Sequence, residues 1–218
     1  MTRLLDLGLE RITERIMNMA KLSEMCVINA IESYEKGIVK KTQIFEWSEK
    51  LKVSQSEVAD LATELSMRYQ PVATDLRYIR SCMEIAYGFS RFGRYAYDIV
   101  ELLETIGSFH KCDKSLVMES SNVASKMIRL SINALQTKEK NTVSTLYKMD
   151  DSVDSLYRKY LKDLITLKAN SNDHPLNDPR CAISALLIMR YLERIADHAC
   201  YIGDSVYFIV TGQSSPRK

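Results

Sequence analysis

Apolar residues recur along most of the chain at alternating steps of three and four, which is the spacing of the buried stripe of a bundled α-helix. Two long runs lie about a hundred residues apart. The later run comprises Ala185, Ile188, Leu192, Ile195, Ala199, Ile202, Val206 and Ile209. The earlier run comprises Cys82, Ile85, Phe89, Phe92, Ala96, Ile99, Leu103 and Ile106. No alternating strand pattern competes with them.

Glycine, proline and capping residues divide the chain into six expected helices. Their ranges are about 2–35, 41–69, 74–106, 114–136, 140–168 and 179–212. Pro179 follows Asp178 and suits a first helical position, and Asp75 is a candidate cap for the third helix. Residues 169–179 form the one clear loop. Sustained three–four spacing favours near-antiparallel packing, so we predict an all-α bundle.

The two long runs belong to an internal duplication. At a shift of 103, Asp75 aligns with Asp178, Arg77 with Arg180, and Ile85 with Ile188. We therefore predict a six-helix bundle made of two pseudo-symmetric three-helix repeats. The expected repeats are residues 1–107 and 108–212, and residues 213–218 are an expected disordered tail.

The two copies of the duplication differ in their acidic residues. The sixth helix carries Glu193 and Asp197 four residues apart, and the fifth helix carries Asp150 and Asp154 at the same spacing, with Asp151 between them. The apolar seam places Glu193 and Asp197 at outward-facing positions of their helix. If the two helices are neighbours, the carboxylates converge on one groove, a donor set that suits hard or borderline cations such as iron, manganese, magnesium or calcium.

The first repeat has lost this pattern. Ser90 and Arg94 stand opposite the sixth-helix acids, and Gln55 and Ala59 stand opposite the fifth-helix pair at a shift of 95. Arg94 puts a cation where a metal ion would sit. Glu57 and Asp60 lie one register off, and we expect no cluster in the first repeat.

A simpler interpretation of the acidic pairs is a solvated surface, which any helical bundle needs. The sequence offers three arginines as counter-ions, Arg158, Arg190 and Arg194. No E-x-x-H motif of the ferritin-like di-iron type is present. His198 is five residues beyond Glu193 on a different face, and we interpret it as an ordinary histidine at the edge of the bundle.

Composition narrows the protein class. The net charge of +2 gives no basic field for nucleic acid. No secretory signal is visible, and the longest apolar run, Cys181 to Met189, is too short to span a bilayer. Five cysteines without C-x-x-C spacing argue against a disulfide framework and a thiolate zinc site. We therefore expect a cytoplasmic protein with free thiols and no direct membrane insertion.

Three stretches resemble the PhoU family of phosphate-uptake regulators. They are PVATDLRYIR (Pro71 to Arg80), MDDSVD (Met149 to Asp154) and LERIADHACYIGD (Leu192 to Asp204). The resemblance implies a cytoplasmic accessory protein that damps phosphate uptake or phosphate-starvation signalling. It also implies iron or zinc clusters on E(D)-x-x-x-D motifs at the bundle surface, which fall here on Asp150, Asp154, Glu193 and Asp197, with Asp151 as an extra candidate.

The resemblance further implies partners rather than catalysis. These are the ATPase subunit of the phosphate transporter and, in many bacteria, a membrane sensor histidine kinase. The chain shows no nucleophile elbow, Walker loop or GxGxxG motif. A metal-free helical scaffold and a metal-dependent hydrolase remain as alternatives to the adaptor, and a homodimer is left open.

Overall fold

The computed structural model describes residues 4–107, 112–167 and 178–216, and in these ranges the only regular elements are helices. There are six of them, which confirms the expected number and fold class. Each boundary lies within two residues of the sequence-based expectation. The helices are α1 (Leu4–Lys36), α2 (Lys41–Tyr69), α3 (Ala73–Ile106), α4 (Ser115–Thr137), α5 (Thr142–Leu167) and α6 (Pro179–Thr211).

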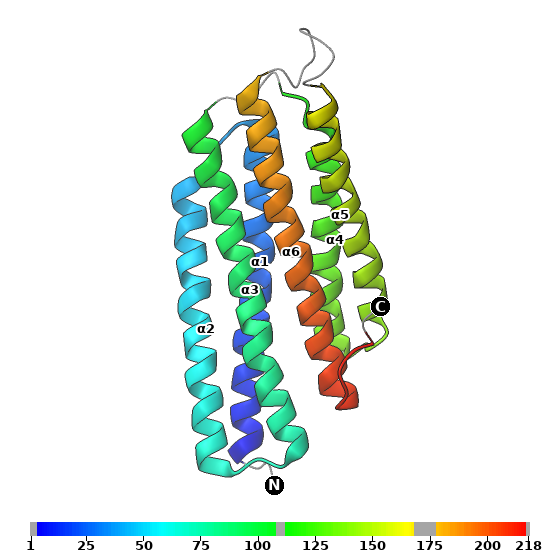
Figure 1. Ribbon diagram of the computed structural model, residues 1–218. Coiled ribbons are helices and arrows are strands. Elements are labelled where there is room, and N and C mark those ends of the chain that lie inside the picture. The colour runs from blue at the N-terminus through cyan, green and yellow to red at the C-terminus, as the bar shows by residue number, and fades with distance from the viewer. Residues whose placement is uncertain (1–3, 108–111, 168–177, 217–218) are drawn as a thin grey trace.

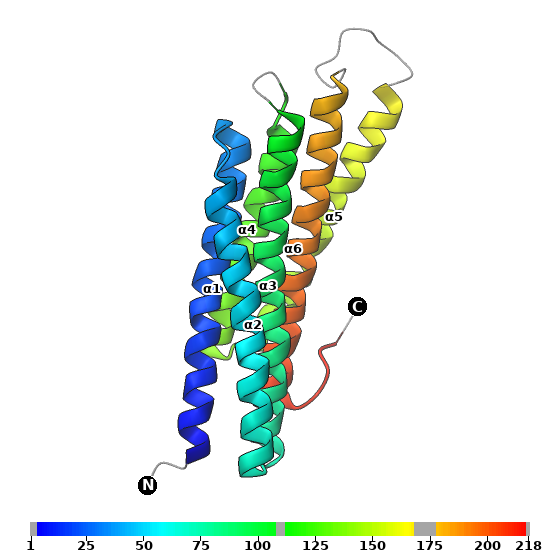
Figure 2. The ribbon, with the colours of Figure 1, turned by 90° about the vertical axis from the view of Figure 1, so that its left-hand side faces the viewer.

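The helices run side by side along one axis as two groups of three (Figure 1). Within each group every helix packs against the other two, and the groups meet through α3 with α6 and α1 with α4. The two outer helices, α2 and α5, lie on opposite sides of the central α3–α6 pair (Figure 1). This arrangement confirms two three-helix repeats. Figure 2 shows that the first group extends beyond the second at one end of the bundle.

The two apolar seams expected from the sequence form the centre of the core. In α3 and α6 every seam residue is buried except the last one in each run, Ile106 and Ile209, which are half-buried. Gly203 lets α5 approach α6 closely, because a Cβ atom there would lie 2.6 Å from Leu146 Cδ1. The burial of one continuous seam accounts for most of the bundle's stability.

Helix starts follow the sequence in one case and depart from it in another. The Asp178 carboxylate accepts a hydrogen bond of 2.9 Å from the Arg180 backbone N–H, with Pro179 at the first helical position, as expected. The expectation that Asp75 caps α3 is wrong. Val72 is the N-cap residue, and Asp75 lies in the first turn, where its charge favours the helix dipole.

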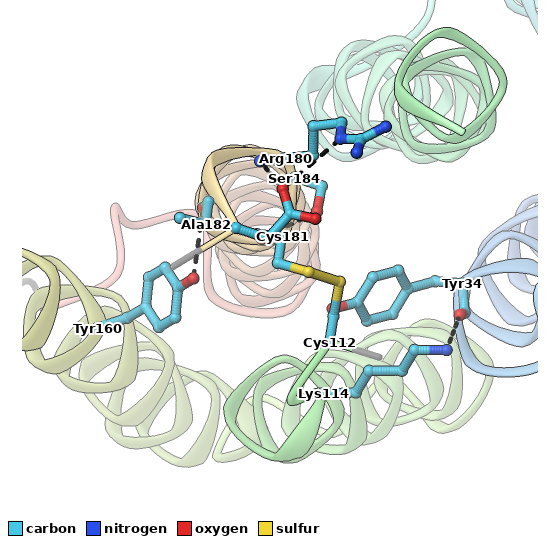
Figure 3. The surroundings of a disulfide bond; sticks show 9 residues. Tyr34, Cys112, Lys114, Tyr160, Arg180, Cys181, Ala182 and Ser184 are labelled. Atoms are coloured by element: carbon cyan, nitrogen blue, oxygen red, sulfur yellow. Dashed lines mark hydrogen bonds and ion pairs between the residues drawn. A yellow bond between two sulfur atoms is a disulfide. The ribbon is translucent and has the colours of Figure 1, made fainter. Parts of the chain in front are cut away.

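Two of the five cysteines form a disulfide, which corrects the expectation of free thiols. Cys112, before α4, is bonded to Cys181 in the first turn of α6, with 5.4 Å between their Cα atoms (Figure 3). The two residues are 69 positions apart, so only the tertiary fold brings them together. Tyr160 beside the bond donates to the Ala182 carbonyl, and Lys114 donates to the Tyr34 carbonyl (Figure 3). Cys26, Cys82 and Cys200 are free and buried.

Two segments named in the sequence analysis lie wholly or partly outside the described residues. They are the expected loop 169–179, of which residues 169–177 lie outside, and the expected tail 213–218, of which residues 217–218 lie outside. Residues 213–216 follow α6, and Ser215 Oγ donates a hydrogen bond to Asp204. No helix in the described part of the chain is long and apolar enough to cross a membrane.

Candidate metal centre: the carboxylate groove between α5 and α6

The fold places the predicted site residues of the fifth and sixth helices on facing surfaces of α5 and α6, which pack against each other. We call the site formed by Asp150, Asp154, Glu193 and Asp197 the carboxylate groove. Val153 and Leu146 of α5 are fully buried on the same side of the helix, and this burial fixes the rotation of α5 toward α6. The acids of the two helices lie close enough to raise one another's pKa values, as the causes of the shifts at Asp150 and Asp154 indicate.

The pKa of Asp150 is raised by causes that lie on both helices. Burial raises the pKa of Asp150 to about 7, and repulsion from Asp197, Asp154, Asp151 and Glu193 adds to the effect. Two of these groups belong to α5 beside Asp150 and two to α6 across the groove. A negative charge on any of these neighbours disfavours ionisation of the Asp150 carboxyl group.

Two neighbouring aspartates are perturbed in the same direction. Burial, and then Glu193 across the groove, raises the pKa of Asp154, while Arg158 opposes the rise. Burial also raises the pKa of Asp197, against the lowering influence of Arg194. The groove is thus a region of concentrated negative charge that is partly withdrawn from water.

The acidic pair of α6 is less exposed than the sequence suggested. The Glu193 side chain is 16% exposed and that of Asp197 is 30% exposed, whereas the seam pattern alone placed both on an open outer face. The main seam of α6 faces α3 and α4, and α5 covers a second face that the pattern does not reveal. Asp151, the extra candidate, is exposed at the rim.

All three arginines foreseen as counter-ions engage the groove. The Arg190 guanidinium donates to both oxygens of Glu193. Arg194 lies 3.5 Å from Asp197, and Arg158 lies 3.6 Å from Asp154. Each arginine sits three or four residues from its acid on the same helix, so all three pairs are local.

The donor chemistry of the groove fits a cation, but the present side-chain arrangement does not hold one. Asp150 Oδ1 is buried and has no hydrogen-bond partner, so one ligand atom is unused. Carboxylate oxygens suit iron, zinc and harder cations. Within the described ranges, however, no three histidine, cysteine, aspartate or glutamate side chains are arranged to hold a metal ion. Binding would require the arginines to release their acids.

The corresponding surface of the first repeat is built differently. Ser90 is buried, and Arg94 pairs with Asp98 at 2.9 Å and lies over the Tyr97 ring. Glu57, which is one register off the expected motif, pairs with Arg15 of α1. Arg94 thus stands with its own acid on α3 at the position where α6 carries Asp197 in the second repeat, and Glu57 of α2 pairs with α1 instead.

His198, next to Asp197 on α6, is more buried than the sequence suggested. It is buried, at 8% exposure, among the rings of Tyr87, Tyr95 and Tyr201. Burial, followed by the charges of Arg91 and Arg194, lowers its pKa to about 4. The prediction of an edge histidine is wrong because α3 covers this face of α6. The tyrosines of α3 at positions 87 and 95 were the available signal.

With the geometry established, the chain was compared with known proteins. The family model described as PhoU domain matches it twice, at residues 9–103 and 117–206. The chain belongs to the PhoU family. The two matched segments fall one in each three-helix group, so the family's domain is the unit that was duplicated.

Relatives and solved structures agree with this assignment. A Clostridium acetobutylicum protein named phosphate-specific transport system accessory protein PhoU homolog is 26% identical, over 98% of this chain and 97% of its own length. A Synechocystis protein of the same name is 32% identical over 66% of this chain and 62% of its own.

Two crystal structures share the fold. The structure of PhoU from Pseudomonas aeruginosa has a TM-score of 0.85 at 23% identity and covers 95% of this chain and 99% of its own. The phosphate transport system regulatory protein PhoU from Streptococcus pneumoniae has a TM-score of 0.86 at 17% identity, covering 98% and 100%. At these identities the matches establish the six-helix architecture.

Proposed function

We propose that this chain regulates phosphate uptake and phosphate-starvation signalling as a non-catalytic adaptor in the cytoplasm. The match of the PhoU domain to both repeats carries the proposal. It is supported by relatives of nearly equal length that are named as accessory proteins of the phosphate-specific transport system. An adaptor of this kind acts by occupying a partner's surface rather than by turning over a substrate.

The partners we propose are the ATPase subunit of a phosphate ABC transporter and a sensor histidine kinase. Co-purification of the full-length chain with each candidate, at high and at low phosphate, tests this directly. We expect a stable complex with at least one partner and a phosphate-dependent yield. If the chain binds neither partner at high or at low phosphate, the adaptor function is wrong, whatever the metal content.

We further propose that the carboxylate groove holds an iron or zinc cluster, with Asp150, Asp154, Glu193 and Asp197 as ligands and Asp151 as an extra one. The unpartnered buried oxygen of Asp150 and its pKa of about 7 support this, because a cation would relieve both the repulsion and the burial cost. The bound ion would supply positive charge that lets all four acids ionise together.

Elemental analysis of protein purified without chelator tests the cluster. We expect stoichiometric iron or zinc in the wild type and its loss in the double variant Asp150→Asn/Glu193→Gln. The matched control is Glu57→Gln/Asp60→Asn, which removes two acids from the corresponding helix of the first repeat and should leave the metal content unchanged. Substoichiometric metal that is insensitive to the groove variant would contradict the proposal.

A metal-free scaffold is the second candidate, because arginines already balance three of the four acids. The same metal analysis separates the two, since a metal-free scaffold contains no stoichiometric iron or zinc in the wild type or in the double variant. A hydrolase is the less favoured alternative, because the thiol that interacts with the groove carboxylates, Cys200, is buried and burial raises its pKa, which makes it a poor nucleophile.

A further inference from the structure

A second concave site lies further along α6, between α3 and α6, and none of the functions above uses it. It is a cavity of about 860 Å³, within the range of known ligand sites. One stripe of α3 and one stripe of α6 form its walls, and Ser214 and Ser215 close one end. We call it the α3–α6 cavity.

Aromatic rings dominate the walls of the cavity. Tyr87 and Tyr201 flank the buried His198, with ring centroids 5.7 and 5.4 Å from the histidine ring, and Phe208 lies further along α6. Tyr87 and Tyr201 are 48% and 51% exposed, so part of each ring is open to a ligand. His198 Nδ1 has no hydrogen-bond partner in the described part of the protein, so the wall also has an unused polar atom.

The charged residues of the cavity favour a cationic ligand. The lining contains the carboxylates of Glu84 and Asp204 and a single guanidinium, that of Arg80. An anionic ligand would meet two carboxylates. Faces of tyrosine and phenylalanine rings attract cations, so the apolar and the acidic parts of the wall select the same charge.

Arg80 of the chain itself makes both kinds of contact that a cationic ligand would make, one with a ring and one with a carboxylate. Its guanidinium carbon lies 5.6 Å from the centre of the Phe208 ring, and its Nε lies 3.3 Å from Glu84 Oε1. The Arg80 side chain is 69% exposed, so the pair with Glu84 is screened by water and is easily exchanged. The other Glu84 oxygen accepts only a long hydrogen bond, 3.3 Å, from Ser205.

We propose that the α3–α6 cavity binds an arginine side chain presented by a partner protein. The guanidinium would pair with Glu84 and stack on the exposed rings, and its alkyl stem would cover apolar wall. Arginine fits better than lysine because its planar group stacks on rings while it donates to a carboxylate. This inference goes beyond the adaptor function and does not depend on metal in the carboxylate groove.

The ring signal of His198 in NMR spectra of the full-length protein gives a direct test. The signal is assigned by comparison with His198→Gln, and the probe is Nα-acetyl-arginine amide. We expect a saturable shift of the signal. Nα-acetyl-citrulline amide has the same shape without the charge and should bind about tenfold more weakly, the usual range of a cation–aromatic and charge-assisted contact.

A matched pair of variants locates the contact. Glu84→Gln should weaken binding of the arginine probe about fivefold or more, since a charge-assisted hydrogen bond is lost. Glu64→Gln is the control, because Glu64 also pairs with an arginine four residues away on its own helix and is similarly exposed, but lies on α2. The Asp150→Asn/Glu193→Gln variant should bind the probe as the wild type does.

Four outcomes would overturn the proposal. They are the absence of a saturable shift, equal binding of the citrulline probe, an unchanged affinity in Glu84→Gln, and occupation of the cavity by another group. If the His198 signal of the variant Arg217→Ala/Lys218→Ala differs from that of the wild type when no probe is present, the chain's own tail is the occupant. A shift on concentrating the protein alone would identify a second copy of the chain.

Discussion

Asp150 on α5 and Asp197 on α6 repel each other across the carboxylate groove. After burial, the Asp197 charge is the largest cause of the raised pKa of Asp150, which reaches about 7. The protonation of Asp150 therefore depends on charges carried by both helices. Several expected outcomes follow from the groove and its surroundings.

The first concerns pH. Because the pKa of Asp150 is higher in the folded than in the unfolded protein, the folded state binds the extra proton, and stability falls as pH rises from about 4 to about 7. In metal-free protein we expect Asp150→Asn to remove this loss and to be more stable by about 2 kcal/mol at pH 8, less than the full shift implies because the groove is half open to water. Urea unfolding at pH 4 and pH 8 measures the difference.

The control for this experiment is Asp163→Asn on the same helix, outside the carboxylate groove. It should not alter the pH dependence of the unfolding free energy between pH 4 and pH 8. An Asp150→Asn protein whose stability still falls over that interval as steeply as the wild type's would show that another group holds the proton.

The second concerns the arginine that engages Glu193. Replacing Arg190 by Met keeps the apolar stem and removes the cation, so we expect a loss of about 1 kcal/mol of stability in chelator-treated protein. The same variant should take up zinc more tightly, because no guanidinium competes for Glu193. Thermal unfolding and zinc titration measure the two effects, and Arg180→Met, an exposed arginine of α6, is the control. Weaker zinc uptake in Arg190→Met would speak against the groove as a metal centre.

The third concerns the disulfide. The bond between Cys112 and Cys181 closes a loop of 69 residues, and we expect its removal to lower the free energy of unfolding by about 3 kcal/mol. Urea unfolding with and without dithiothreitol measures the loss. The variant Cys112→Ser/Cys181→Ser should match the reduced wild type and be insensitive to the reductant. Equal stability of reduced and oxidised wild type would mean that the bond does not stabilise the folded bundle relative to the unfolded chain.

The fourth concerns the contact that sets the α5–α6 distance. In Gly203→Ala the new methyl group meets Leu146 Cδ1, and we expect a cost of about 1–3 kcal/mol. In a Leu146→Ala background the collision is gone, so the same substitution should cost much less. The two unfolding free energies form a double-mutant cycle. Additive costs would show that α5 does not rest on Gly203.

The helices themselves were predictable from local signals. The three–four spacing around Ile188 and Ile85, the Asp178–Pro179 start and the glycines at 107 and 212 act over a few residues, and the sequence carries them explicitly. The duplication was likewise readable from aligned positions. The acidic motif of the candidate site was found for the same reason, because Glu193 and Asp197 lie one helical turn apart.

Other features depend on distances between residues far apart in the chain. The pairing of Cys112 with Cys181, the burial of His198 beneath tyrosines of α3 and the half-burial of Glu193 against α5 arise only when the helices pack. A helical repeat specifies which face of each helix is apolar. It does not specify which neighbour covers the flanking face.

The sequence by itself therefore determined six helices, their duplication and the family, because periodicity and motifs are local properties of the chain. Only the tertiary structure decided that charges from two helices raise the pKa of the half-buried Asp150, and that α3 and α6 leave an aromatic, acidic cavity between them. The physical reason is that burial and Coulomb interaction depend on separation in space, which packing sets.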